Sequence, residues 1–292
     1  MDKLIQTLIS GLSLGSIYAL IALGYTMVYG IAKMLNFAHG DIIMVGAYAV
    51  ITAVFTMGLP PFIAILISIA LCALLGIVIE FLAYRPLRQA QPLAVLITAI
   101  GVSYLLQNLA LLIYGSEQKA FPTIVALPTV HIGGVYIDGI TLATLVVTAV
   151  IMVALSLFIN KTRMGKAMRA VSEDKEAAEL MGISVNRTIT VTFAIGSALA
   201  GVAAIFYGAA YTYIRPTTGA MPGIKAFTAA VFGGIGSIPG ALLGGVLLGI
   251  IEIFAKAYIS TQLSDTIVFA VLIVVLIVRP AGLLGKQVRE KV

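Results

Sequence analysis

Charged residues and cysteine are scarce in this chain, and each shortage excludes a class of protein. Lysine, arginine, aspartate and glutamate together make up 10% of the 292 residues, against about 25% in a typical soluble domain. Cysteine occurs once, as Cys72 inside an apolar run, so neither an intrachain disulfide nor a cysteine metal cluster can form. We expect Cys72 to be a small packed apolar residue. The composition excludes an ordinary soluble domain and a disulfide-stapled one.

Groups that could support catalysis are also scarce. The two histidines, His39 and His131, lie in loops that we predict on opposite sides of a membrane, which leaves no paired metal or nucleophile site. Residues 39–41 lack the first glycine of the GxGD motif of intramembrane aspartyl proteases. The Gly-Lys pair at 285 and 286 is not followed by Ser or Thr, as a phosphate-binding loop requires. We therefore predict no enzyme, no catalytic residue, no metal site and no cofactor; any ATP must bind to another polypeptide.

What the chain has in abundance is apolar sequence, at 61% of its residues. A membrane-spanning helix needs about 20 such residues, and long apolar runs favour helices over the alternating strands of a barrel. We predict an all-α, polytopic membrane protein with a single transmembrane domain over 1–292 and eight to nine transmembrane helices. The eight clear spans lie near 5–30, 40–57, 61–82, 93–114, 141–159, 189–213, 238–257 and 263–279. A ninth candidate, 218–234, is short and interrupted by glycine and proline; the first span is interpreted as a retained helix rather than a signal peptide.

One long polar segment, 161–187, interrupts this apolar sequence. Within it, Ser172 is predicted to cap a short helix that has carboxylates in its first turn, and Gly182 to end that helix. Three apolar residues share one face of the helix: Ala177, Leu180 and Met181. So short a helix cannot bury this ridge by itself. The ridge either folds back onto the membrane domain or contacts a partner protein.

Basic residues predict the orientation, because cytoplasmic loops are enriched in lysine and arginine. If the 161–187 segment is cytoplasmic, alternation places three further basic residues on the same side: Lys33, Arg85 and Arg88. The loop 115–140, with a predicted hairpin near Gly133-Gly134, is then external, as is the N-terminus. If 218–234 crosses, the basic C-terminal residues are cytoplasmic: Arg279, Lys286, Arg289 and Lys291. The charge rule thus favours nine crossings.

Two further features concern the inside of the membrane. Glycines recur near four-residue spacing, which permits close helix packing within the subunit or against a second subunit: Gly240, Gly244, Gly245 and Gly249. Glu252 is a mid-span carboxylate that Lys256 can pair with, and Glu80 lies near a span end, close to Arg85 and within reach of the interface. So few intramembrane carboxylates weaken, without eliminating, the alternative of an ion-gradient-driven secondary carrier.

The run RAVSEDKEAAELMGI, at 169–183, resembles the cytoplasmic coupling loop of permease subunits in bacterial ATP-binding-cassette importers, specifically the branched-chain amino acid permeases of the LivH/LivM type. GYTMVYGIAKMLNFAHGDIIMVGAY at 24–48 resembles the amino-terminal signature of that family, and GGIGSIPGALLGG at 233–245 extends the likeness along the chain. The resemblance implies that eight residues couple the permease to its ATPases: Arg169, Ala170, Asp174, Glu176, Ala177, Leu180, Met181 and Gly182.

The resemblance also implies the function and the partners. We expect a permease of the bacterial cytoplasmic membrane that moves leucine, isoleucine and valine with energy from partner ATPases. The expected partners are a second, related permease subunit, two cytoplasmic ATP-binding subunits, an external substrate-binding protein and membrane lipid, with no role for nucleic acid. Candidate residues of the translocation path are Asn36, His39 and Asp41. The alternative hypothesis is a permease of the same type that carries urea or short amides.

Overall fold

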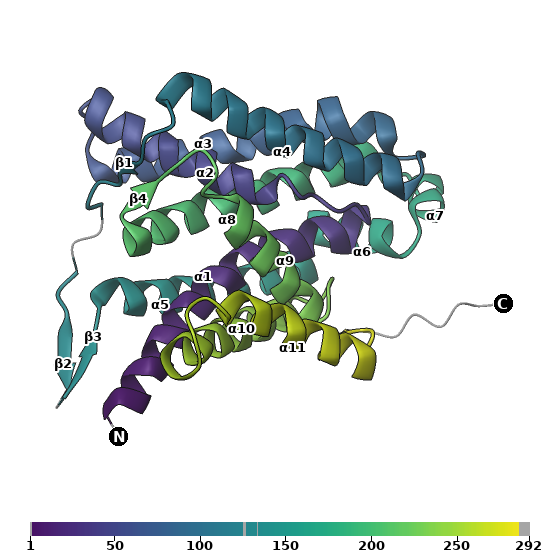
Figure 1. Cartoon of the computed structure of the whole chain (residues 1–292). Coiled ribbons are helices and arrows are strands. Elements are labelled where there is room, and N and C mark those ends of the chain that lie inside the picture. The colour runs from purple at the N-terminus through teal and green to yellow at the C-terminus, as the bar shows by residue number, and fades with distance from the viewer. Residues whose placement is uncertain (1, 125–126, 133, 286–292) are drawn as a thin grey trace.

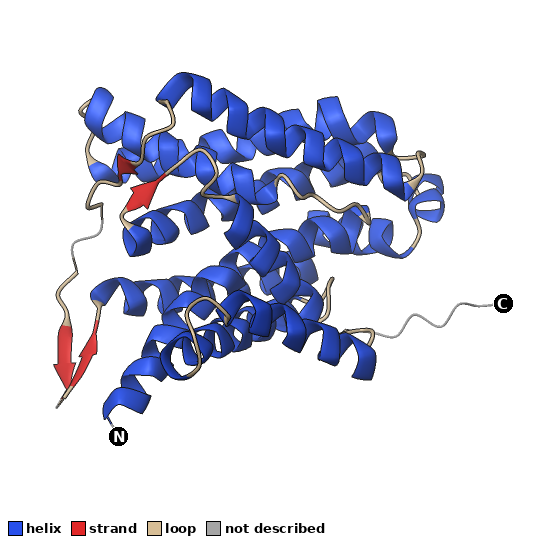
Figure 2. Ribbon diagram, viewed as in Figure 1, coloured by secondary structure: helices blue, strands red, loops and turns tan. Residues whose placement is uncertain are grey.

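The computed structural model describes residues 2–124, 127–132 and 134–285. Over these residues the fold is almost entirely helical (Figure 2). The α-helices are α1 Asp2–Ala32, α2 His39–Ile51, α3 Pro61–Ile79, α4 Pro92–Tyr114, α5 Gly139–Lys161, α6 Arg163–Glu173, α7 Lys175–Leu180, α8 Val185–Tyr211, α9 Ala220–Gly233, α10 Ile238–Tyr258 and α11 Ser264–Val278. Short π-helices follow α2 (η1, Thr52–Thr56) and α3 (η2, Glu80–Tyr84), and a 3-10 turn, η3, covers Arg85–Leu87.

Seven of the helical segments in the described residues are long and apolar enough to cross a membrane, which confirms the all-α polytopic class. They correspond to the predicted spans except for 263–279, which is the fifteen-residue α11. That helix ends at Val278 because Pro280 follows, and a residue before proline disfavours helical backbone. Of the basic C-terminal residues, Lys286, Arg289 and Lys291 lie outside the described residues.

Helix α1 lies at the centre of the molecule, in contact with α2, α5, α8, α9 and α10 (Figure 1). Its middle section is buried along its whole circumference, from Leu14 to Val28. Helix α10 packs most closely against it: a Cβ on Gly245 would meet Ala19, and one on Gly249 would meet Gly15. Small residues on both helices therefore let the two backbones touch.

The other two glycines of the predicted stripe face α9. A Cβ on Gly240 would lie 2.5 Å from the carbonyl oxygen of Gly233, and one on Gly244 would meet the carbonyl oxygen of Ala229. All four glycines thus approach backbone of this same chain. Of the two packing partners that the spacing left open, the structure places the stripe against helices within the subunit.

The short segment 218–234 is built around α9, which packs one face of its first turns inside the bundle. At its first turn Gly219 and Gly223 lie against Gly40, at the start of α2. At its last turn Gly233 lies against α10, close to the end of α1, and the backbone N–H of Leu283 donates to Phe232 O over 2.9 Å. Residues 212–233 therefore take the chain from the end of α8 to the side where α1 ends, in a non-helical half followed by a helical half.

Two small strand pairs lie at the end of the bundle where α4 and α8 finish (Figure 1). Strand β1, Lys119–Ala120, pairs antiparallel with β4, Tyr213–Ile214. Strand β2, Val130–Ile132, pairs antiparallel with β3, Val135–Ile137, which forms the hairpin predicted in the 115–140 loop; Gly133 itself lies outside the described residues. The side-chain amide of Gln6 in α1 holds this hairpin by donating to Tyr136 O over 2.9 Å.

Candidate functional site

The polar segment 161–187 forms two short helices, α6 and α7, rather than one. Thr162 caps α6 by accepting from the backbone N–H of Gly165 over 3.0 Å. Asp174 caps α7, because its Oδ1 accepts from the backbone N–H groups of Glu176 and Ala177 over 2.9 and 3.0 Å. The prediction that Ser172 is the cap was wrong. Ser172 lies within α6 and its hydroxyl donates to Arg169 O, as serines inside helices do, whereas Asp174 has the extended backbone that a cap requires.

Helix α7 ends where predicted, at a glycine. Gly182 adopts a left-handed φ of +81°, which costs a glycine little strain, and the backbone N–H of Ile183 closes the turn on Ala178 O over 3.0 Å. Just before this turn, the side chains of Leu180 and Met181 are 89% and 82% exposed. In a solvated polar loop, large apolar side chains so exposed indicate an interaction surface.

The opposite face of α7 packs on the rest of the protein. Ala178 is 4% exposed, while Ala177, on the side of the ridge, is exposed. The ridge of Ala177, Leu180 and Met181 therefore does not fold back onto the described part of the membrane domain. Of the two arrangements that the sequence allowed, the structure shows the one that leaves the ridge free for a partner.

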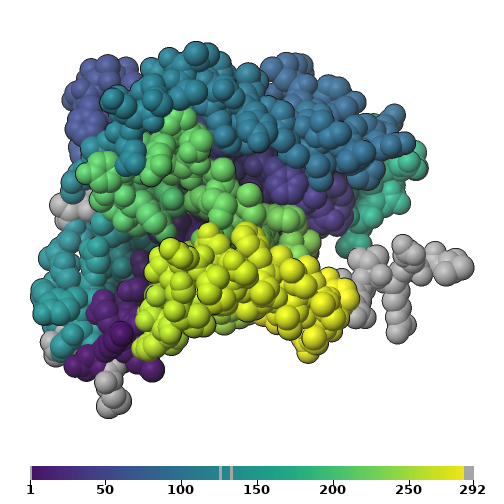
Figure 3. All heavy atoms as spheres, in the orientation of Figure 1, coloured from purple at the N-terminus to yellow at the C-terminus, as the bar shows by residue number. Residues whose placement is uncertain are grey.

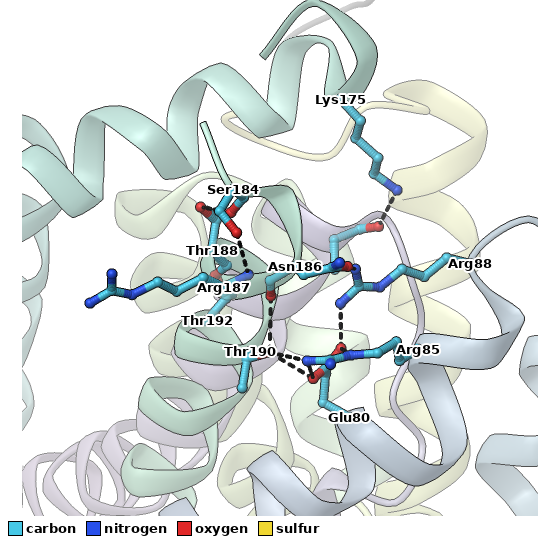
Figure 4. A network of polar contacts seen from close by, with 11 residues as sticks. Glu80, Arg85, Arg88, Lys175, Ser184, Asn186, Arg187, Thr188, Thr190 and Thr192 are labelled. Atoms are coloured by element: carbon cyan, nitrogen blue, oxygen red, sulfur yellow. Dashed lines mark hydrogen bonds and ion pairs between the residues drawn. The ribbon is translucent and has the colours of Figure 1, made fainter. Parts of the chain in front are cut away.

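Helix α7 is tied to the central helix by one lysine. The Lys175 ammonium donates to the carbonyl oxygen of Ala32, the last residue of α1, over 3.0 Å (Figure 4). Burial lowers the pKa of Lys175, and the neighbouring charges of Arg88 and Lys33 lower it further. The cost of bringing this cation against other cations is offset by a bond to a helix C-terminal carbonyl, where the helix dipole is negative.

A buried carboxylate lies beside this contact, as Figure 4 shows. Glu80 is completely buried and pairs with Arg85, whose Nη2 lies 3.1 Å from Oε2. It also pairs with Arg88 and accepts from the hydroxyl of Thr190, in α8, over 2.8 Å. The predicted proximity of Glu80 to Arg85 is confirmed, but the carboxylate is enclosed by protein rather than reaching the interface. The sequence offered no sign of Thr190, which is 110 residues away.

The three candidate path residues are all buried: Asn36 2%, His39 0% and Asp41 1% exposed. Each contacts a different helix. Asn36 Oδ1 accepts from the Tyr84 hydroxyl over 3.0 Å, Asp41 Oδ1 accepts from Gln107 in α4 over 3.0 Å, and the His39 ring packs edge-on against Tyr25 of α1. They brace the entry to α2, and their role in a path stays a prediction.

A second buried carboxylate, Glu252, lies on the far side of α1. It pairs with Lys256 over 2.6 Å, as the four-residue spacing predicted. It also pairs with Lys225 of α9 over 2.8 Å and accepts from the Tyr18 hydroxyl of α1 over 2.9 Å. Sequence spacing could not reveal these two partners, because they come from other helices.

Comparison with known proteins gives concordant results. The chain matches the family described as "Branched-chain amino acid transport system / permease component" over residues 7–276. It is 47% identical to the high-affinity branched-chain amino acid transport system permease protein BraD of Pseudomonas aeruginosa, over 99% of this chain and 98% of that protein. It is 45% identical to the corresponding permease protein LivH of Escherichia coli K12, over 99% and 97%.

A more distant similarity, 27% over 93% of this chain and 83% of the relative, is to the autoinducer 2 import system permease protein LsrD of Escherichia coli. No solved structure gave a significant match. With the family matched over most of its length and full-length relatives above 40% identity, this chain belongs to the permease components of branched-chain amino acid transport systems, and is a multi-pass inner-membrane protein rather than an enzyme.

Proposed function

We propose that this chain is the permease subunit of an ATP-driven importer for leucine, isoleucine and valine. The observation that carries the proposal is the exposed ridge of Leu180 and Met181, on a helix that is capped at Asp174, ended at Gly182 and anchored to α1. The substrate class rests on the full-length similarity to BraD and LivH, whose names state that class.

The contacts suggest how movement of the ATPases reaches the membrane. A partner ATPase that binds the ridge pushes α7 and α6 as it closes on ATP. The bond from Lys175 to Ala32 then carries the displacement to the end of α1. Because α1 is in backbone contact with α10 through Gly15 and Gly249, the push tilts these helices together. Such tilting opens the path alternately to the two sides.

The surface beside the short helix α9 favours a second permease subunit on the opposite side of the translocation path. The described chain leaves three apolar or aromatic side chains of this region at the surface: Tyr213 56%, Met221 43% and Ile224 42% exposed. Figure 3 shows this green region between the blue helices α3 and α4 and the yellow α11. Irregular backbone at membrane depth is tolerated only beside protein or a water-filled cavity. We therefore assign this face to the translocation path, with the second permease opposite.

The proposed orientation places residues 161–187 and the C-terminal residues after α11 in the cytoplasm. The N-terminus and 115–140 are then external. A pair of cytoplasmic ATPases and an external binding protein complete the system. The two buried glutamates, Glu80 and Glu252, argue against the ion-driven carrier, because basic side chains of the chain itself form ion pairs with both.

The test is transport by the complete importer. The chain is purified with the subunits that accompany it in its native membrane and reconstituted in vesicles with the binding protein. We expect an associated ATPase and a second hydrophobic subunit, and uptake of labelled leucine only with ATP. Leucine uptake driven by an ion gradient without ATP would establish the carrier instead, and ATP-driven uptake of urea but not of leucine would reject the substrate class.

A further inference from the structure

The helix that begins as α3 does not stay α-helical at the end that we propose faces the cytoplasm. After Ile79 the chain forms the π-helix η2, over Glu80–Tyr84, and then the 3-10 turn η3. Such π-helical turns are uncommon and are often found at functional sites, because they interrupt the regular hydrogen bonding of the helix. Both ends of η2 make specific contacts with other parts of the chain. The segment η2 therefore connects the end of α3 to other parts of the chain.

The first of these contacts is the Glu80 cluster. The carboxylate accepts from Arg85 and Arg88 of its own segment and from Thr190 in the second turn of α8. Arg88 in turn donates to Asn186, in the first turn of α8. One fully buried carboxylate thus neutralises two guanidinium groups, each of which also bonds to α8, and without it these two cations would face each other. Arg88 would also face the nearby Lys175.

The second contact lies at the other end of η2. The Tyr84 hydroxyl lies 3.2 Å from Leu35 O and 3.0 Å from Asn36 Oδ1. These residues belong to the linker 33–38, which joins α1 to α2. The residue just before the linker, Ala32, accepts the bond from Lys175 of α7. The attachment of α7 and the attachment of η2 are therefore adjacent on the chain.

We propose that Glu80 is a positioning residue for transport, which makes the ends of α3 and α8 and the linker 33–38 move as one body when α7 is pushed. The proposal rests on the coupling role of α7 proposed above. Apolar side chains would hold two helix ends at least as firmly as a buried ion cluster. What the cluster adds is direction: its bonds fix one register of η2 against α8, so that a displacement of either is passed to the other.

The experiment separates transport from hydrolysis. Complete importers carrying Glu80→Gln, Glu80→Asp or Thr190→Val are reconstituted, and ATP hydrolysis and leucine uptake are measured on the same preparation. We expect Glu80→Gln to retain hydrolysis and to lower the leucine taken up per ATP about fivefold or more, a typical coupling effect. Thr190→Val, which removes the hydroxyl's bonds to Glu80 and Arg85 but leaves the ion pairs of Glu80 in place, lowers the same ratio by less. Glu80→Asp, which keeps the charge, restores part of it.

The matched control is Glu117→Gln, which neutralises an exposed carboxylate in the loop after α4 and leaves the ratio unchanged. An unchanged ratio in both Thr190→Val and Glu80→Gln overturns the proposal. Equal losses of assembled protein, hydrolysis and uptake across the three variants overturn it as well, since they mean a structural role only. If Glu80→Gln does not assemble, the ratio in Thr190→Val decides.

Failure of this proposal is distinguishable from failure of the proposed function. The substitution Leu180→Asp tests the α7 ridge alone. If it leaves uptake and hydrolysis unchanged, α7 has no coupling role. If it abolishes ATP-driven uptake while the Glu80 and Thr190 variants keep the normal ratio, only the positioning role of Glu80 is rejected.

Discussion

Lys225 and Glu252 form a buried ion pair, with Nζ 2.8 Å from Oε1, that joins α9 to α10. Lys225 also lies 2.6 Å from Asp265 at the start of α11, and Lys256 lies 2.6 Å from Glu252. Two acids and two bases therefore balance, and the Tyr18 hydroxyl of α1 supplies a further donor. These contacts hold the short helix α9, which has non-helical chain on its N-terminal side, to α10 and α11, and they hold α10 to α1.

Removing the shared carboxylate is expected to destabilise the protein strongly. Glu252→Ala leaves Lys225, at 8% exposure, with the half-exposed Asp265 in place of its buried partner, and breaking a buried pair costs about 3 to 5 kcal/mol. Lys256→Met costs less, because its side chain is 32% exposed and Lys225 still neutralises Glu252. Thermal unfolding of the purified subunit in detergent measures both. A Glu252→Ala protein as stable as Lys256→Met would contradict the shared role of the carboxylate.

The α7 ridge is expected to serve transport rather than stability. Leu180→Asp places a charge on a side chain that is 89% exposed, so folding is unaffected while contact with the ATPase is lost and ATP-dependent uptake disappears. Ala178→Asp is the matched control: the residue is 4% exposed, and a buried unpaired charge lowers the amount of folded protein. Membrane abundance and uptake are measured together. Normal uptake by Leu180→Asp would remove the ridge from the mechanism.

The cap of α7 is expected to matter through its geometry and not its charge. Asp174→Ala removes the side-chain oxygen that accepts from two backbone N–H groups and destabilises this short helix by about 1 kcal/mol, so uptake falls. Asp174→Asn keeps a capping oxygen and retains most of the uptake. Rates of leucine uptake at equal protein amounts distinguish the two. A result in which Asn behaves like Ala would show that the carboxylate charge itself is needed.

The contact between α1 and α10 is expected to tolerate no side chain at Gly249. A Cβ there would meet backbone atoms of Gly15, so Gly249→Ala separates the helices at a cost of about 1 to 3 kcal/mol. Gly101→Ala in α4 is the control, because a Cβ there meets nothing within 4 Å. Replacing a glycine inside a helix by alanine stabilises the helix by about 1 kcal/mol. The two variants should shift the unfolding temperature in opposite directions, and a stabilised Gly249→Ala would refute the close contact.

The orientation is testable by thiol labelling, since the native Cys72 is buried. Cysteine replaces Tyr136 in the β2–β3 hairpin, 59% exposed, or Met181 in the ridge, 82% exposed. In cells whose inner membrane is intact, an impermeant reagent should label the first and reach the second only after permeabilisation. The reverse pattern would invert the proposed topology. A cysteine at position 290, in the C-terminal residues that the structure does not describe, provides an independent test and should be shielded from the reagent in intact cells.

Much of this protein is encoded locally. Hydropathy alone predicts the membrane class and the principal spans, because a helix in lipid must satisfy its backbone within one apolar stretch. The end of α7 at Gly182 and the pairing of Lys256 with Glu252 are equally local, since a left-handed turn and a four-residue spacing involve only near neighbours. The cap of α7 shows the limit of local prediction. Helix α6 continues through Ser172 to Glu173, so the residue after it, Asp174, becomes the cap.

The tertiary structure alone decided which polar groups distant in the sequence meet. Glu252 finds Lys225 27 residues away and Tyr18 234 residues away, while Glu80 finds Thr190 across 110 residues. A local pattern records that a carboxylate lies in an apolar run and must be paired, but its partner is set by the path of the whole chain. For the same reason the sequence left 218–234 open. Whether a helix too short to span forms part of a crossing depends on the neighbours that enclose the non-helical chain beside it.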